Sequence, residues 1–131
     1  MRPHSKNVKK KYPEVQIVSK GDVNHLIRSC STLIVTGLTT VIVQAQILEK
    51  PVISIPLIDY KWGNPTVFKS GSCVETKIEE LDIILKKVVD DRKFRNEIIN
   101  QGKKFVNECI ENRDEASKKI WMHIKNLEKV N

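Results

Sequence analysis

Two short apolar runs, separated by a helical segment, constrain the fold more than any other feature. Residues 32–35 (TLIV) and 52–55 (VISI) are apolar almost throughout, as expected for strands of a parallel sheet that is covered on both faces. Lys50-Pro51 closes the segment between the two runs. These runs predict two neighbouring strands joined through a helix.

The connection begins with Gly37 directly after the first run, followed by Leu38, Thr39 and Thr40. Either threonine can cap a helix that continues to about Glu49. The helix is apolar nearly all round, so packing must hold it. The turn between strand and helix is where we expect a ligand, because ligands of open α/β sheets bind outside the carboxyl ends of the strands.

The residues before this unit repeat the same order of elements. Residues 14–18 (EVQIV) alternate and are β-branched, which predicts a strand. Asp22 is a candidate cap for a helix with apolar residues spaced for one face, at Val23, Leu26, Ile27 and Cys30. We therefore predict an α/β fold, a Rossmann-like parallel sheet of about four strands flanked by helices.

The chain after the second run changes character twice. Residues 56–72 are rich in Gly and Pro, and we assign them no regular element, with a short strand expected near Cys73-Val74. Within this loop, Tyr60 and Trp62 can either stack on a ligand or pin the loop to the core. Residues 76–131 read as a C-terminal helical segment, whose helices start at a capping box at Thr76–Glu79, at Asp90 or Asp91, and at Asp114. We predict one domain over residues 1–131, with the β/α core in residues 1–75.

Charge and cysteine usage bear on partners and location. The formal net charge is +7, and the basic N-terminal cluster lacks the interleaved aromatic residues of a nucleic-acid-binding module. Cys30, Cys73 and Cys109 have no CxxC spacing, so we predict core thiols in a reducing, cytoplasmic setting, with no metal and no disulfide. We expect no nucleic-acid partner, whereas peripheral contact with a membrane surface stays open. The sequence is silent on oligomeric state.

The motifs in this order resemble those of GT-B fold glycosyltransferases of surface or capsular polysaccharide biosynthesis. The segment GLTTVIVQA (residues 37–45), followed by EKPVI (residues 49–53), is similar to the G-x-S-T-x-x-x-E-A and G-K-P-V-I segment of their C-terminal, nucleotide-sugar-binding half. The run RPHS at residues 2–5 is similar to their R/K-x-H-P turn. The tail from Phe68 through Asp114 is similar to the end of the same enzymes, so the likeness spans nearly the whole chain.

The resemblance implies a nucleotide-diphosphate sugar, held in a cleft between two Rossmann-like domains, and no cofactor. It implies that this chain is the C-terminal part of a longer two-domain protein, with the missing N-terminal domain as the other wall and the source of the catalytic base. It names no catalytic residue here. The donor-binding residues that it implies are Arg2, His4, Gly37, Leu38, Thr39, Thr40 and Gln44.

Three departures from the family pattern leave alternatives open. Gln44 stands where the family has a ribose-bonding Glu, Glu49 replaces a Gly, and Ser5 replaces a Pro. An amide can bond a hydroxyl but carries no charge. A nucleotide-sugar 2-epimerase of the UDP-N-acetylglucosamine type shares the fold, and a non-catalytic binding or scaffold module is the alternative from another class. Thr39 and Thr40 are either phosphate ligands or simple caps.

Overall fold

The computed structural model describes residues 7–8, 10–18, 20–58, 65–110 and 115–128. Within these ranges the chain is an α/β fold with a three-stranded parallel sheet in the order β1-β2-β3. The strands are β1 (Leu33–Thr36), β2 (Val52–Ile55) and β3 (Val74–Glu75), and each connection carries a helix. The predicted parallel sheet is therefore confirmed, whereas the prediction of about four strands is wrong for the described residues.

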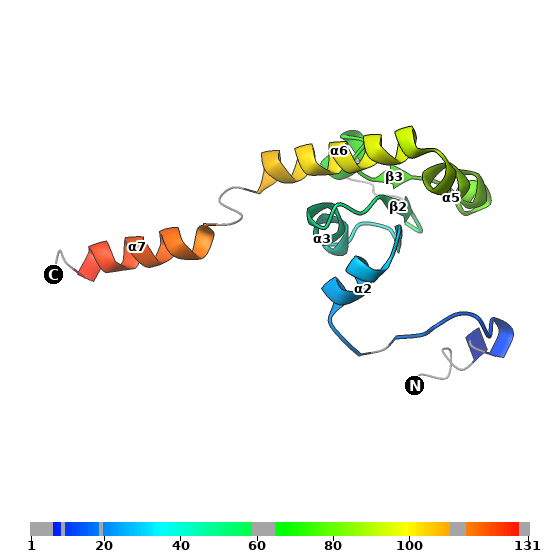
Figure 1. Cartoon of the computed structure of the whole chain (residues 1–131), viewed down its shortest axis with the longest axis horizontal. Helices are drawn as coiled ribbons and strands as arrows, with labels where there is room; N and C mark the ends of the chain where they lie inside the picture. Colours follow the sequence, from blue (N-terminus) through cyan, green and yellow to red (C-terminus); the bar gives the residue numbers. More distant parts are fainter. Residues whose placement is uncertain (1–6, 9, 19, 59–64, 111–114, 129–131) are drawn as a thin grey trace.

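The helices divide between the two faces of the sheet, as Figure 1 shows. Three of them, α2 (Val23–Ser29), α3 (Val41–Ile47) and α4 (Thr66–Lys69), lie in or before the strand connections, and α5 (Leu81–Asp90) and α6 (Arg92–Cys109) follow the last strand. The fold ends with α7 (Ala116–Glu128). None of the helices in the described ranges is both long enough and apolar enough to cross a membrane.

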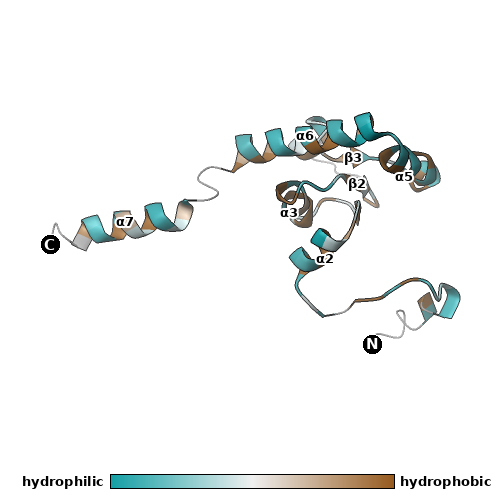
Figure 2. Cartoon of the chain, in the orientation of Figure 1, coloured by the Kyte–Doolittle hydropathy of each residue, from teal (hydrophilic) through white to brown (hydrophobic). Residues whose placement is uncertain are grey.

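Two apolar clusters make the core, one on each face. The first joins β2 to α2, α3 and α4 through Ile27, Ile42, Ala45, Val52 and Val67, all buried. The second joins the other face to α5 and α6 through Ile53, Val88 and Ile98. Register explains the division, because Val52 is opposite Leu33 whereas Ile53 is opposite Ile34 and Val74. Figure 2 shows the hydrophobic colouring of α3, which is the central helix of the first cluster.

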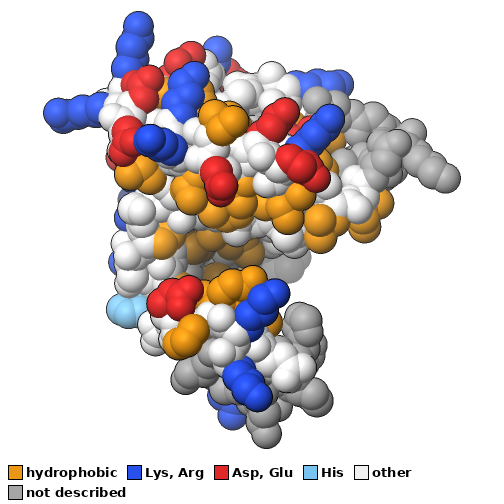
Figure 3. Space-filling model, turned by 90° about the vertical axis from the view of Figure 1, so that its right-hand side faces the viewer, with side chains coloured by type: hydrophobic (Ala, Val, Ile, Leu, Met, Phe, Trp, Pro, Cys, Tyr) orange, Lys and Arg blue, Asp and Glu red, His pale blue; other side chains and the backbone are white. Residues whose placement is uncertain are grey.

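The strand predicted at residues 14–18 does not form. No described strand lies beyond β1, so this segment joins no ladder, and the side chains of Val15 and Val18 are exposed. Figure 3 shows hydrophobic side chains around a hollow between the main body and a smaller lobe. Alternating apolar residues favour a strand, but a strand needs a paired neighbour to satisfy its backbone.

Two further predictions about the second half of the chain need correction. The capping box at Thr76–Glu79 is wrong: the N–H of Thr76 donates to Ser54 O at 3.0 Å and prolongs the sheet, and the helical path begins with a 3-10 turn, η1 (Ile78–Glu80). The loop at residues 56–72 contains α4, which is only four residues long. Tyr60 and Trp62 lie outside the described residues.

The cysteine prediction holds for one thiol of three. Cys73 is buried, Cys30 is partly buried and donates to Ile27 O at 3.1 Å, and Cys109 is exposed. Cys109 sits at the last residue of α6, beyond the part of that helix that packs on the sheet. All three are free thiols.

Candidate functional site

A hollow of about 330 Å³ lies at the start of both α3 and α4. We call it the α3–α4 hollow. It is at the carboxyl end of β1, where the turn into α3 begins, and one wall comes from α6. Its lining residues are Leu38, Thr39, Thr40, Ile42, Val43, Pro65, Thr66, Val67 and Phe105.

The turn that enters α3 is fixed to the sheet by Gly37. This glycine has φ of 78°, a left-handed conformation that a residue with a side chain rarely adopts. Its N–H donates to Ile55 O at 2.9 Å, and its carbonyl accepts from Ser54 Oγ at 3.1 Å. Both backbone groups are therefore used within the sheet, and Gly37 does not line the hollow. Its observed role is to turn the chain at the carboxyl end of β1.

Thr39 is the residue that caps α3. Its Oγ1 accepts from the N–H of Val41 at 3.4 Å, a long contact, and its carbonyl accepts from the N–H of Ile42 at 3.1 Å. Thr40 already has helical dihedral angles, φ −61° and ψ −21°, and behaves as the first residue of the helix. The backbone N–H groups of Thr39 and Thr40 donate to no group of the described residues. Two donors beside the hollow are thus left without a partner among the described residues.

A second helix starts at the same hollow. The carbonyl of Pro65 accepts from the N–H of Phe68 at 3.0 Å and of Lys69 at 3.2 Å. The N–H groups of Thr66 and Val67 make no hydrogen bond to the described part of the chain. Because α3 and α4 both begin here, the unpaired N–H groups of two helix starts lie at one hollow.

The described lining carries no charged side chain. Six of its nine side chains are apolar and the other three are threonines, so none of these nine is an ionisable acid or base near neutral pH. Across the described ranges, no group of three or more His, Cys, Asp or Glu is placed to hold a metal ion. The described residues of the α3–α4 hollow offer a ligand backbone N–H groups, threonine hydroxyls and apolar contact.

The structure brings together some of the predicted site residues and separates others. Leu38, Thr39 and Thr40 line the hollow, whereas Gln44 is not among its described lining residues. The Oε1 of Gln44 is buried and has no hydrogen-bond partner in the described part of the chain. Arg2 and His4 lie outside the described residues. Sequence reasoning missed Pro65, Thr66 and Phe105. The Pro-Thr pair, which is typical of a helix start, was the available signal for the first two.

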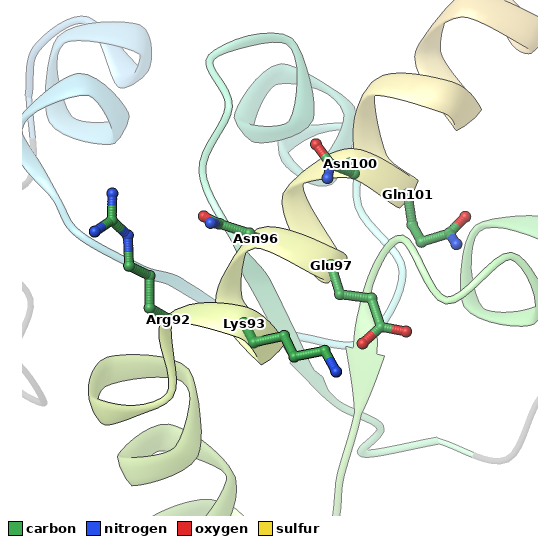
Figure 4. A pocket seen from close by; sticks show the side chains of 6 residues that line it. All are labelled: Arg92, Lys93, Asn96, Glu97, Asn100 and Gln101. Carbon is green, nitrogen blue, oxygen red and sulfur yellow. The ribbon is translucent and has the colours of Figure 1, made fainter.

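Another surface depression lies along α6, of about 880 Å³ and lined by Arg92, Lys93, Asn96, Glu97, Asn100 and Gln101. All six residues belong to one helix. Figure 4 shows that their side chains form two rows on either side of α6 instead of converging. This arrangement is typical of the solvated face of an amphipathic helix, and we assign it no ligand.

Comparison with known proteins adds no family to this geometry. No protein-family model matches the sequence, and neither a curated protein nor a solved structure matches it.

Proposed function

We propose that the chain binds a nucleotide-diphosphate sugar at the α3–α4 hollow, as the nucleotide-sugar-binding half of a glycosyltransferase. The observation that carries this proposal is the pair of N–H groups on Thr39 and Thr40 that donate to no described residue, beside a hollow at the carboxyl end of β1. Backbone N–H groups at a helix start bind phosphate oxygens well, because the donors converge and the helix dipole favours negative charge.

The rest of the hollow suits the uncharged parts of such a ligand. A volume of about 330 Å³ is at the lower end of the range for small-molecule sites. The side chains of Leu38, Val43 and Phe105 offer apolar contact to a base or to the face of a sugar ring. None of the described lining residues is titratable, and the resemblance to two-domain enzymes implies that the base for sugar transfer comes from a second domain.

The binding step is tested by following backbone amide shifts during titration with UDP, CDP and GDP at up to millimolar concentration. We expect shifts at Leu38–Val43 and at Thr66–Val67 with at least one nucleotide. If none of the three moves these amides, the proposal is wrong.

Thr40→Pro sharpens this test. The φ of −61° at Thr40 fits a proline ring, and proline is well accepted at the first position of a helix. The substitution removes an N–H that makes no bond within the described protein, so the fold should survive. A lost bond to a charged group is worth about 1.5–3 kcal/mol, so affinity should fall by about tenfold or more. Thr40→Ala keeps the N–H and is the matched control, which should bind nearly as the native chain does.

A non-catalytic binding module is the second candidate, favoured by a described lining made only of apolar side chains and threonines. This reading predicts nucleotide binding by the whole protein without release of nucleoside diphosphate from any nucleotide sugar. Turnover of a nucleotide sugar by the protein would rule it out.

A further inference from the structure

One buried side chain connects the elements that form the walls of the α3–α4 hollow. Gln46 lies in α3 and is 2% exposed. Its Nε2 donates to Ser72 O at 3.1 Å and to Ser72 Oγ at 2.9 Å. A long polar side chain is rarely placed so deep without hydrogen bonds, and here Nε2 makes them, whereas Oε1 is buried without a partner among the described residues.

Ser72 passes this connection to α4. Its hydroxyl donates to Val67 O at 2.9 Å, and Val67 lines the hollow. Ser70 Oγ strengthens the link, since it lies 3.0 Å from the same carbonyl and 2.8 Å from Ser72 Oγ. Gln46 therefore fixes α3 relative to α4 through a short chain of hydrogen bonds.

The stem of Gln46 is also the surface on which α6 rests. A Cβ placed on Gly102 would lie 3.2 Å from Gln46 Cγ and 3.5 Å from Gln46 Cβ. The two helices come this close because residue 102 has no side chain. Phe105, the lining residue from α6, is three positions further along the same helix. The position of the third wall thus also depends on Gln46.

We propose that Gln46 is a positioning residue for the α3–α4 hollow, setting how far Val67 and Phe105 stand from the start of α3. The expected effect on nucleotide affinity rests on the proposed function. The geometry of the walls can be measured without any ligand. Gln46 touches no part of the hollow itself and acts through Ser72 and Gly102.

The test compares Gln46→Met, which keeps the length of the side chain but removes the amide, with Gln44→Met as the matched control on the same helix. In the ligand-free protein, we expect Gln46→Met to shift the amide signals of Val67 and Phe105, and Gln44→Met to leave both in place. With UDP, CDP or GDP, whichever binds the native chain, Gln46→Met should raise Kd about tenfold or more. Thr40→Pro should raise Kd without moving the signals of Val67 and Phe105, because it removes a donor and leaves the walls in place.

Unmoved signals at Val67 and Phe105 in a folded Gln46→Met protein would overturn the inference, as would an unchanged Kd. If Gln46→Met does not fold, Gly102→Ala takes its place, because it retains the amide and forces α6 away from Gln46 by a few tenths of an ångström. An unmoved Phe105 signal and an unchanged Kd in Gly102→Ala would then overturn the inference. If no nucleotide binds the native chain, the proposed function fails, while the ligand-free signals still decide the role of Gln46.

Discussion

Arg95 Nη2 donates to Ser31 O at 2.7 Å, a contact between residues 64 positions apart in the sequence. Ser31 directly precedes the segment that enters β1, and Arg95 lies in the first turns of α6. This bond holds the long helix against the beginning of the edge strand. This contact is polar, and it links the helical second half of the chain to the β/α first half.

Replacing this arginine should weaken the whole fold. Arg95→Met keeps much of the stem and removes the donor, and we expect a loss of about 1 kcal/mol in the free energy of unfolding, since the bond is at the surface. Urea denaturation measures it. Arg92→Met is the control, because the exposed Arg92 on the same helix makes no hydrogen bond or ion pair to a described residue. Equal losses in the two variants would contradict the expectation.

The start of α6 depends on Asp91. Its Oδ1 accepts from the N–H of Phe94 at 3.0 Å, which confirms the predicted N-cap. Asp91→Ala should lower the free energy of unfolding by about 1 kcal/mol, and Asp91→Asn should retain most of it, because the amide oxygen can accept the same bond.

Asp90, one position earlier, is the control for this cap. It is the last residue of α5, where a negative charge is unfavourable to the helix dipole. Asp90→Ala should therefore be neutral, or stabilising by a few tenths of a kcal/mol. Thermal unfolding of the three variants would contradict this interpretation if Asp90→Ala were the most damaging.

The thiols should differ in reactivity and in pH dependence. Burial, with a smaller contribution from the carboxylate of Glu75, raises the pKa of Cys73 to about 12. Cys109 is exposed and should react first with a thiol reagent at pH 8, whereas Cys73 should react only after unfolding. Mass analysis of the labelled peptides gives the order. Labelling of Cys73 before Cys109 in the native protein would contradict this order.

The raised pKa also predicts how stability depends on pH. Below the ordinary thiol pKa of 9.0, Cys73 is neutral in both the folded and the unfolded chain, so its titration does not change the free energy of unfolding. Between pH 9 and about 12 only the unfolded chain loses this proton, so the native state loses stability by up to about 1.4 kcal/mol per pH unit. Cys73→Ala should lack this loss, so its free energy of unfolding should approach that of the native chain as the pH rises above 9.

The last helix should be dispensable for the core. Figure 1 shows α7 apart from the other described elements, and its apolar residues Ile120, Trp121, Ile124 and Leu127 are exposed. A helix of 13 residues without packing is marginal in water. A chain that ends at Ile110 should keep the thermal midpoint of the core within a few degrees. A collapse of the midpoint would show that α7 stabilises the sheet.

The central part of the fold could be predicted from local pattern. The run at residues 52–55 specifies β2, which is buried at every position, because a strand covered on both faces is apolar throughout. The run at residues 32–35 also predicts a strand, but β1 lies at the edge of the sheet and its Ile34 is exposed. The strand predicted at residues 14–18 does not form. Alternating apolar residues give one segment a preference for strand, but a β-ladder also needs a neighbouring strand, which this pattern does not supply. The short α4 was missed since four residues carry too little periodicity.

The hollow was only half predictable. The turn at Leu38–Thr40 follows from a glycine and two threonines after a strand. Phe105 could not be placed there from sequence, because its position depends on how closely α6 approaches α3. The signal for that approach was present in Gly102, a glycine inside an otherwise good helix. A glycine inside a helix costs about 1 kcal/mol relative to alanine, and the close approach of Gln46 explains why this position has no side chain.

The uncovered side of β1 has a consequence for the protein in solution. An edge strand whose outer backbone groups lack a partner among the described residues can pair with the same edge of another molecule. The net charge of +7 opposes this encounter, since like-charged copies repel. Salt screens that repulsion while leaving the short-range backbone bonds intact. Self-association of this chain should therefore increase with ionic strength, so that its solubility is set by charge rather than by coverage of the sheet.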